Sequence, residues 1–396
     1  MINKICYILN NFPLPSETFI SDEAASFIDI GVTPFILVIN KGNFSLIQPS
    51  ARKLLDKNLV TFILPCTKLQ SLYSVFLLFF HRPKRVYGCL LKSLRSQDRW
   101  LYFQAACYAT LLLKNKVDFL HAHFADMNLN WAKVLSDWTG IPFGVTTHRY
   151  DLLNDPISRD KVTRLFKQSH LIVTISEWNK QFMMQKYEID SDKIRVIHCG
   201  VDVEKFKPLE VMKVQSKLRL LNVGRLVPEK GQDILLHALA KARAEGVEFE
   251  VVIIGSGELE DNLKSLSIKL QLDDYVKFMG AQSQDYIVNS LKSTDIFVLS
   301  SRSEGLPVVC MEAMSSGVLM IATKINGIPE LVQRGVNGLL VESGDVSGLA
   351  GAIIWANHNS EAVNKIRIAA RETVINEFNR KKCTLRLLNE MNSVCC

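Results

Sequence analysis

The stretch LRLLNVGRLVPEKGQDILLHALAKARAEGVEFEVVIIG (residues 218–255) predicts a strand, a loop, an amphipathic helix and a second strand. Apolar strands joined by helices are typical of a parallel sheet that is covered on both faces. The same alternation recurs along the chain, and further strand-like runs are KICYILN (4–10), TPFILVIN (33–40), VDFLHAH (117–123), PFGVTTH (142–148), HLIVTIS (170–176), KIRVIH (193–198), YVKFM (275–279), DIFVLS (295–300) and VLMIAT (318–323). We therefore expect an α/β protein with doubly wound, Rossmann-like sheets.

The chain has 396 residues, which is too long for one ordinary core. A polar stretch near 200–217 divides it into two halves of comparable size. We expect an N-terminal domain over 1–205, a second domain over 206–375, and a C-terminal helix over 376–396 that packs back on the N-terminal domain. Two doubly wound domains that face each other would place the carboxyl ends of their strands along a shared cleft.

The composition indicates a globular protein from a reducing compartment, with 48% hydrophobic and 22% charged residues. Its nine cysteines are scattered, odd in number and without a CxxC pair, which favours free thiols over disulfides or a zinc site. The N-terminus lacks the pattern of a signal peptide, and the apolar segment 75–80 is too short to span a bilayer. We expect a cytoplasmic location.

The net charge is +7, and residues 82–99 carry six lysines and arginines against the single acid Asp98. Aromatic and aliphatic segments flank this basic stretch at 69–80 and 100–113. One interpretation is a helical surface that rests on an anionic bilayer, at the inner face of the cytoplasmic membrane. The alternative is a set of core helices with a solvated basic face.

The segment RSEGLPVVCMEAMSSG (302–317) predicts a loop after a strand, followed by a helix. Glu304 would precede this helix, and Glu312 would lie inside it. The amides of Gly305 and Leu306, with Pro307 at the helix start, suit an anion because the helix dipole is positive there. The alternative is that Glu304 is a cap and Glu312 a satisfied residue at the helix edge.

A second candidate anion site lies in the loop NVGRLVPEKG (222–231), where Arg225 and Lys230 flank a turn. A guanidinium and an ammonium near a helix N-terminus suit a diphosphate. Solvated loop charges are the alternative. A third candidate is Gly255-Ser256-Gly257, which begins a dinucleotide fingerprint, but Glu260 stands in place of its third glycine. This favours a nucleotide-like ligand and argues against NAD.

In the first half, FPLPSETFI (12–20) follows a strand, so that Ser16 caps a helix with Glu17 in its first turn. His121 and His123 end another strand and lie on one face of it, because strand side chains alternate. His148 and Asp151 follow a third strand. All of these are candidate contacts for a substrate.

Three histidines raise the possibility of zinc, with His121, His123 and His148 as ligands. We favour neutral imidazoles that donate hydrogen bonds to ligand hydroxyls or phosphate, and expect no metal. Histidines that merely terminate strands are the structural alternative. The pair Asp190 and Asp192 precedes a strand, at the wrong end for such a site, and predicts a turn.

Four motifs together resemble retaining glycosyltransferases of family four, which have the GT-B fold. They are HCGVDVEKF (198–206), GRLVPEKG (224–231), SEGLPVVCME (303–312) and NGIPELVQRGVNGLLV (326–341). HAHFA (121–125) and TTHRYDL (146–152) look further like bacterial exopolysaccharide or colanic-acid transferases of this family. The match covers nearly the whole chain.

The resemblance implies a UDP- or GDP-sugar donor, no metal or other cofactor, and a sugar or lipid-linked oligosaccharide as acceptor. Arg225 and Lys230 match the residues that bind the diphosphate. Glu312 matches the acid on the ribose hydroxyls, and Glu304 the acid near the donor sugar. His148 matches a histidine near the reacting sugar.

Two positions depart from the family pattern. The loop Pro13-Leu14-Pro15-Ser16 replaces a common pair of glycines, and Arg149 stands where close relatives commonly have glycine. Two other classes compete with a transferase. A nucleic-acid-binding protein would use the basic surface but would not need paired carboxylates, which repel phosphate, so we expect no nucleic acid. A nicotinamide dehydrogenase is disfavoured by the incomplete glycine fingerprint.

Overall fold

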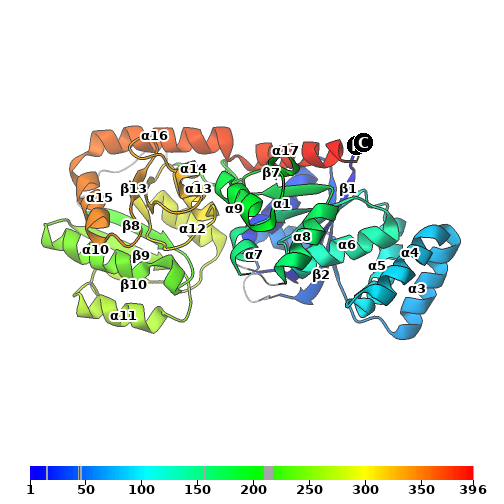
Figure 1. The fold of residues 1–396 in the computed structure, drawn as a ribbon. Coiled ribbons are helices and arrows are strands. Elements are labelled where there is room, and N and C mark those ends of the chain that lie inside the picture. Colours follow the sequence, from blue (N-terminus) through cyan, green and yellow to red (C-terminus); the bar gives the residue numbers. More distant parts are fainter. Residues whose placement is uncertain (15–16, 43, 45–46, 155–156, 209–216, 396) are drawn as a thin grey trace. The chain divides into compact units, whose positions relative to one another are not determined.

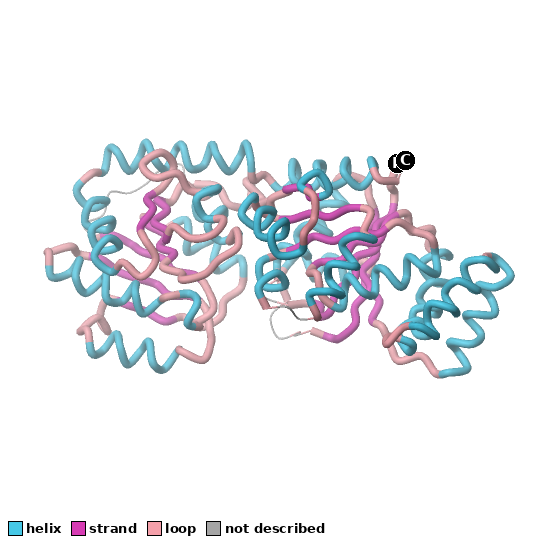
Figure 2. The backbone as a smooth tube through the Cα atoms, viewed as in Figure 1, coloured by secondary structure: helices cyan, strands magenta, loops and turns pink. Residues whose placement is uncertain are grey.

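The computed structural model describes residues 1–14, 17–42, 44, 47–154, 157–208 and 217–395. The chain forms two compact units. We call Met1–Ile197 together with Thr384–Cys396 the N-terminal unit, and His198–Cys383 the C-terminal unit. Each unit has its own parallel sheet with helices on both sides (Figures 1 and 2). The prediction of two Rossmann-like α/β domains is confirmed.

In the described part of the N-terminal unit, seven parallel strands form one sheet in the order β3-β2-β1-β4-β5-β6-β7. Strands β4 and β5 are buried at every position, because helices cover both faces of the sheet. The strand bounds are β1 (Lys4–Phe12), β2 (Thr33–Lys41), β3 (Val60–Phe62), β4 (Phe119–His123), β5 (Phe143–Thr147), β6 (Leu171–Thr174) and β7 (Ile194–Val196).

Strands β1, β2 and β3 follow one another in one direction across the sheet, and β4 then pairs with the opposite edge of β1. Crossover connections are nearly always right-handed, so this reversal puts the later helices on the opposite face of the sheet. One face carries α1 (Thr18–Asp29) and α2 (Pro49–Asp56). The other carries α6 (Met127–Thr139), α7 (Arg149–Leu153), α8 (Arg159–Gln168) and α9 (Glu177–Tyr187), and a 3₁₀ turn η1 (Ser191–Lys193) precedes β7.

Three helices connect β3 to β4, namely α3 (Lys68–His81), α4 (Pro83–Arg95) and α5 (Arg99–Lys114). They pack against one another, and α5 also packs against α6 (Figure 1). A capping box at Thr67 and Gln70 begins α3, since each side chain bonds the backbone N–H of the other residue. This connection carries the basic, aromatic segment that the sequence singled out.

In the described part of the C-terminal unit, six parallel strands form a sheet in the order β10-β9-β8-β11-β12-β13. Its direction of growth also reverses once, between β8 and β11. The strand bounds are β8 (Leu218–Val223), β9 (Phe249–Ile254), β10 (Val276–Phe278), β11 (Ile296–Leu299), β12 (Leu319–Thr323) and β13 (Leu339–Val341).

Two groups of helices cover the C-terminal sheet. Helix α10 packs against α11 and α15, whereas α13 packs against α16. The core is built from Leu, Ile and Val side chains of these strands and helices. The helix bounds are η2 (Pro228–Lys230), α10 (Gln232–Ala244), α11 (Glu260–Lys269), α12 (Gln284–Lys292), α13 (Val308–Ser315), α14 (Ile328–Leu331), α15 (Val346–His358), α16 (Ser360–Glu377) and α17 (Arg380–Ser393).

Each unit therefore has one topological switch point. This is the pair of neighbouring strands whose following connections run to opposite faces of the sheet. In the N-terminal unit it lies between β1 and β4, and in the C-terminal unit between β8 and β11. Ligands of open parallel sheets bind beyond the carboxyl ends of the strands at such points. The loops after these four strands are thus the first places to examine for a site.

The last helix, α17, belongs from Thr384 onward to the N-terminal unit. Thr384 Oγ1 donates a hydrogen bond of 3.1 Å to Ser26 Oγ on α1. Ile2 N donates one of 2.8 Å to Asn392 Oδ1. Leu387 and Met391 on the same helix are fully buried, so the end of the chain completes the N-terminal core.

We predict that Leu387→Ala lowers the free energy of unfolding of the N-terminal unit by about 2–5 kcal/mol, because it leaves a cavity under α17. The matched control is Leu385→Ala in the same helix, where the side chain is 45% exposed against 1% for Leu387. Urea denaturation followed by circular dichroism measures both. Equal midpoints for the two variants would contradict the packing of α17.

Candidate functional site

In the C-terminal unit, the loops after β8 and β11 meet at the switch point. Ser300 Oγ donates a hydrogen bond of 2.7 Å to Gly231 O. Lys230 Nζ therefore comes within 2.5 Å of Glu304 Oε1. Ser301 Oγ donates to the same carboxylate oxygen at 2.7 Å. Two candidates that lie 74 positions apart in the sequence thus form one ion pair.

Gly231 permits this contact. Its φ is +61°, a conformation that disfavours any side chain, and a Cβ at this position would overlap with the carbonyl oxygen of Ser300. Only glycine lets the two backbones approach so closely. The Lys230–Glu304 pair therefore depends on Gly231, which the sequence predicted at the start of the helix.

Gly255 and Gly257 have a similar role one strand further along the sheet. A Cβ on Gly255 would overlap with Gly224 O, and one on Gly257 with Leu226 O. Leu226 N donates a hydrogen bond of 3.0 Å to Ser256 O across this contact. These two glycines thus join the loop after β9 to the loop that carries Arg225.

The other residues predicted to bind the donor lie close to Lys230 or Glu304 in the sequence. Arg225 is exposed, whereas Glu312 on α13 and Leu306 are buried. Helix α13 begins directly after Pro307, and Gly305 lies in the loop between Glu304 and the helix. The structure places all of these candidates on the two loops that flank the switch point or on the helix that follows.

Sequence reasoning did not identify two residues that hold Glu304. Besides Ser301, Asn326 donates a side-chain hydrogen bond of 2.8 Å to the Glu304 carbonyl oxygen. Asn326 opens the quoted motif NGIPELVQRGVNGLLV, which was the available signal. Arg302 pairs with Asp233 at the start of α10 at 2.6 Å, which further fixes the loop after β11.

In the N-terminal unit, the loop after β1 borders a pocket that residues of β1, α1 and α2 also line. Asn11, Pro13, Leu14 and Glu17 are among its lining residues. Burial, and then the charge of Asp126, raise the pKa of Glu17 to about 7. Ser16, the predicted helix cap, lies outside the described residues.

The carboxyl ends of β4 and β5 bring the three candidate histidines together. His123 pairs with Thr146 of β5 in the parallel register, and His148 directly follows β5. His123 Nδ1 lies 3.1 Å from His148 Nε2. His121 Nε2 lies 2.9 Å from Thr146 Oγ1. All three rings are buried, as a fully covered parallel sheet requires.

Burial lowers the pKa of His121 to about 3. Burial, and then the neighbouring histidines, hold the pKa of His148 well below its usual value. Both imidazoles are therefore neutral near pH 7. Their proton assignments depend on their hydrogen-bond partners.

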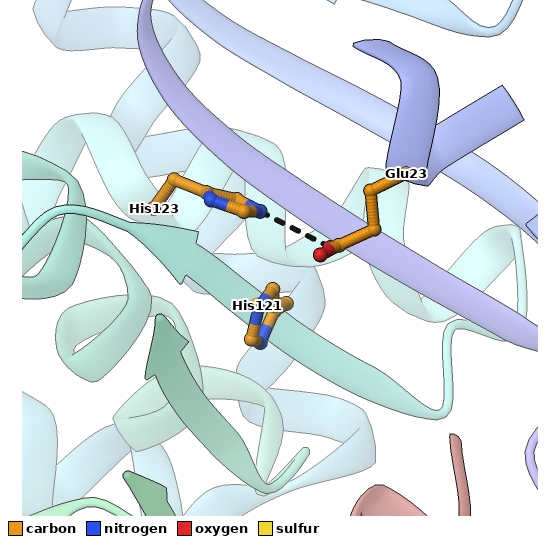
Figure 3. A group of neighbouring side chains, drawn as sticks. All are labelled: Glu23, His121 and His123. Carbon is orange, nitrogen blue, oxygen red and sulfur yellow. Dashed lines mark hydrogen bonds and ion pairs between the residues drawn. The ribbon is translucent and has the colours of Figure 1, made fainter. Parts of the chain in front are cut away.

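Glu23 on α1 completes this cluster, and sequence reasoning missed it. Its Oε1 lies 3.2 Å from His123 Nε2, as Figure 3 shows. Tyr7 Oη on β1 donates a hydrogen bond of 2.8 Å to the same oxygen. Burial acts to raise the pKa of Glu23, but the charges and hydrogen bonds of His123, with smaller effects of His121 and Tyr7, hold it below its usual value. The helical spacing of α1 was the only signal that Glu23 faces the sheet.

Glu23, His121 and His123 also have the spacing of a metal site, since their ligand atoms all lie within 4.8 Å of one another. Two histidines and a carboxylate form a ligand set that zinc accepts. In the structure, hydrogen bonds to Tyr7 and His123 already engage the carboxylate. The sequence suggested His148 as a third ligand, but it is not part of this set.

Asp151 has a structural position. Its carboxylate accepts hydrogen bonds from the backbone N–H groups of Ala125 at 2.7 Å and His148 at 2.9 Å. Burial raises its pKa to about 8, with a further rise from Asp126, while the backbone donors act in the opposite direction. Asp151 thus joins the loops after β4 and β5 and fixes the backbone at His148.

Two family models match the chain. The model described as "Glycosyl transferases group 1" matches residues 205–373, and that described as "Glycosyltransferase Family 4" matches residues 60–205. The chain belongs to the family-four glycosyltransferases. The resemblance inferred from the motifs is confirmed, and the rival classes of nucleic-acid-binding protein and dehydrogenase find no support.

Curated relatives match this glycosyltransferase over nearly its whole length. It is 28% identical to the putative colanic acid biosynthesis glycosyltransferase WcaL of Escherichia coli K12, over 96% of this chain and 97% of WcaL. It is also 28% identical to the amylovoran biosynthesis glycosyltransferase AmsK of Erwinia amylovora, over 95% and 96% of the two chains. An Escherichia coli UDP-Gal:α-D-GlcNAc-diphosphoundecaprenol α-1,3-galactosyltransferase is 28% identical over 68% of this chain and 73% of its own.

Solved structures show the GT-B fold of this glycosyltransferase. A glycosyltransferase from Rickettsia africae ESF-5 matches with a TM-score of 0.77 and 21% identity, over 99% of this chain and 98% of its own. Anabaena HepE in complex with UDP-glucose matches with a TM-score of 0.75 and 19% identity, over 98% and 99% of the two chains.

We predict that Gly231→Ala disrupts the loops at the switch point of the C-terminal sheet. The control is Gly246→Ala, because Gly246 also has a positive φ (+82°) but a Cβ added there would meet no atom within 4 Å. The control should lose only the conformational cost of about 1–2 kcal/mol. A larger fall in melting temperature for Gly231→Ala, by calorimetry, is the expected result, and equal falls would contradict the close approach.

Proposed function

We propose that this glycosyltransferase moves a sugar from a UDP- or GDP-sugar to a growing, lipid-linked bacterial surface polysaccharide or oligosaccharide, with retention of the anomeric configuration. The observation that carries the proposal is the Lys230–Glu304 pair at the switch point of the C-terminal sheet. A cation and a carboxylate held together at this position suit a ligand that carries both phosphate and hydroxyl groups.

The donor's diphosphate would be bound by Lys230 and Arg225. Lys230 supplies a mobile point charge and Arg225 a planar set of N–H donors. Arg225 is exposed and therefore accessible to a ligand. Lys230 Nζ forms an ion pair with Glu304. A diphosphate that takes over Lys230 would leave the Glu304 carboxylate to accept hydrogen bonds from sugar hydroxyls.

Glu312 would accept hydrogen bonds from the ribose hydroxyls of the nucleotide, as the family resemblance implies. It lies on α13, whose N-terminus follows Gly305, Leu306 and Pro307. The positive end of the helix dipole favours phosphate near these residues. Preorganised cations of this kind stabilise the charge that develops on the leaving diphosphate, and one lost donor typically costs about 2.7–4 kcal/mol of barrier.

The reaction we propose is a front-face substitution at the anomeric carbon. The bond between that carbon and the diphosphate oxygen breaks, and a bond to the acceptor oxygen forms on the same face. The acceptor proton goes to the departing phosphate. His148, with Glu304, would contact the reacting sugar, and Glu17 and His123 lie among the candidates for the acceptor side. No metal is required in this scheme, because Arg225 and Lys230 supply the positive charge.

The names of the relatives support the substrate classes. WcaL and AmsK are named for exopolysaccharide biosynthesis, HepE was solved with UDP-glucose, and the galactosyltransferase is named for a UDP-sugar and a diphosphoundecaprenol acceptor. These names favour a donor of the UDP or GDP class and an acceptor carried by a membrane lipid. A location at the cytoplasmic side of the membrane follows from such a pair of substrates.

We predict that Lys230→Ala and Glu312→Ala weaken donor binding, each by about 1.5–3 kcal/mol, since each removes a charged hydrogen-bond partner. Lys264→Ala is the matched control, because Lys264 lies on α11 of the same unit in an exposed pair with Glu260. Isothermal calorimetry with UDP, GDP and their sugars measures the change. Donor affinity equal to that of the parent in both site variants would contradict the assignment.

A membrane-bound acceptor requires contact with the bilayer, and α3 and α4 suit it. In α3 the apolar stripe faces solvent: Leu69 is 79% exposed and Phe80 68%, whereas Ser71 and Ser74 on the opposite side are buried. The exposed apolar side chains of α3 are Leu69, Leu72, Tyr73, Phe76, Leu77, Phe79 and Phe80, whereas Leu78 is buried. This inverted pattern is expected for a helix whose apolar face meets lipid.

Helix α4 also exposes large apolar side chains. Tyr87, Leu91 and Leu94 are exposed, whereas Val86, Cys89 and Ser93 are buried. Exposed basic side chains lie on and next to this helix, namely Lys84, Arg85, Lys92, Arg95 and Arg99. Apolar and basic groups side by side suit the surface of an anionic bilayer. Within the described residues, none of the helices is both long and apolar enough to span one.

We predict that the protein sediments with vesicles that contain phosphatidylglycerol and less with phosphatidylcholine alone, and that added salt weakens the binding. The double variant Leu72→Ser/Phe76→Ser should reduce binding at least about tenfold, because it removes two apolar side chains that the bilayer would bury. The matched control, Ile268→Ser/Ile368→Ser, removes two side chains that are 64% and 63% exposed in the C-terminal unit. Equal binding of both double variants would contradict the role of α3.

A further inference from the structure

The cluster at the ends of β4 and β5 contains a chain of hydrogen bonds that starts at Tyr7 on β1 and ends at His148. Its links are Tyr7 Oη to Glu23 Oε1 at 2.8 Å, Glu23 Oε1 to His123 Nε2 at 3.2 Å, and His123 Nδ1 to His148 Nε2 at 3.1 Å. Three secondary-structure elements and the loop after β5 supply these residues. The reaction proposed above gives no role to Tyr7 or Glu23.

The two imidazoles are joined edge to edge. Their centroids are 5.4 Å apart and their planes differ by 20°, while the two facing nitrogens are only 3.1 Å apart. In two rings stacked face to face, the line between the centroids runs perpendicular to the ring planes and passes through no ring atom. Two nitrogens that lie between the centroids therefore exclude a face-to-face stack. The N–H of one ring therefore points along that line at the lone pair of the other, which is the geometry of a good hydrogen bond.

The direction of the chain follows from its two ends. An ionised carboxylate only accepts hydrogen bonds, so Glu23 takes one from Tyr7 and one from the Nε2–H of His123. At the other end, the His148 side chain accepts a hydrogen bond from the backbone N–H of Asp151 at the start of α7, and since Nε2 faces His123, the acceptor is Nδ1. The proton of a neutral His148 is therefore on Nε2, which donates it to Nδ1 of His123.

The surroundings keep the His148 ring in this orientation. Phe19 and Phe124 pack on it, with ring centroids at 4.6 and 4.8 Å. Asp151 accepts a hydrogen bond from His148 N, which fixes the backbone. A flip of the ring would bring a carbon instead of Nε2 towards His123 and break the chain.

We propose that Glu23 and His123 are positioning residues that hold His148 as the Nε2–H tautomer, so that its Nδ1 accepts from the Asp151 N–H and fixes the start of α7. This deepens the proposed function, because His148 is a candidate contact for the reacting sugar, and it rests on the proposed function in that respect.

Nitrogen-15 NMR of histidine-labelled protein tests the tautomer without any substrate. The resonances are assigned by their loss in His148→Phe and His123→Phe. The expected spectrum shows a protonated Nε2 and an unprotonated Nδ1 for His148. A protonated Nδ1, or stoichiometric metal in the purified protein by elemental analysis, would overturn the proposal, because either requires a different arrangement around Glu23.

Glu23→Gln tests the direction of the chain, because an amide can donate to His123 and so reverse every link. We expect this variant to shift His148 towards the Nδ1–H tautomer and to lower kcat by about tenfold or more, with little change in nucleotide affinity. The matched control is Tyr7→Phe, which removes the hydroxyl from the same carboxylate oxygen but leaves the donors and acceptors of both histidines in place. It should retain the parent tautomer and most of the activity.

The outcomes separate this inference from the proposed function. If the parent transfers sugar from a donor, and Glu23→Gln keeps the parent's kcat and tautomer, the positioning role fails while the transferase assignment stands. If no UDP- or GDP-sugar binds or reacts, the proposed function fails, and the NMR experiment still decides the tautomer of His148.

Discussion

The close approach of two backbones, those of the loops after β8 and β11, is the constraint on which the C-terminal site depends. The approach requires glycine at position 231, where a Cβ would overlap with Ser300 O. Because the two loops are in contact, the side chains of Lys230 and Glu304 lie close enough to form an ion pair. Burying part of a carboxylate without a partner would cost several kcal/mol, and Lys230 and Ser301 together remove that cost.

The same physical situation produces the histidine cluster of the N-terminal unit. Parallel strands that are covered on both faces leave no water for polar side chains at their ends. His123 and Glu23 bond each other, Tyr7 donates to Glu23, and His121 Nε2 lies against the hydroxyl of Thr146. Nδ1 of His121 has no hydrogen-bond partner among the described residues. The bonds that are made restrict the side chains, which favours one defined tautomer of a buried histidine.

Helices α3 and α4 expose much of their apolar surface. Leu78 of α3 and Val86 of α4 join the N-terminal core, but the aromatic side chains of both helices are exposed. The sequence could not tell which of these apolar residues are buried, because both faces of each helix contain them. The exposure of Leu69 and Phe80 shows that these two side chains lie outside the core.

The sequence by itself determined the alternation of strands and helices, the two-domain α/β class and the family, because burial patterns and short motifs are local. It also located Lys230, Glu304 and His148 in loops at strand ends. Only the tertiary structure decided which of these residues touch, since the pairs 230–304 and 123–148 form through strand order, and Glu23 is brought to His123 from 100 positions away. The bonds that Asp151 accepts from the backbone of Ala125 and His148 could not be predicted for the same reason: hydrogen-bond partners are set by packing in space, which no spacing along the chain reveals.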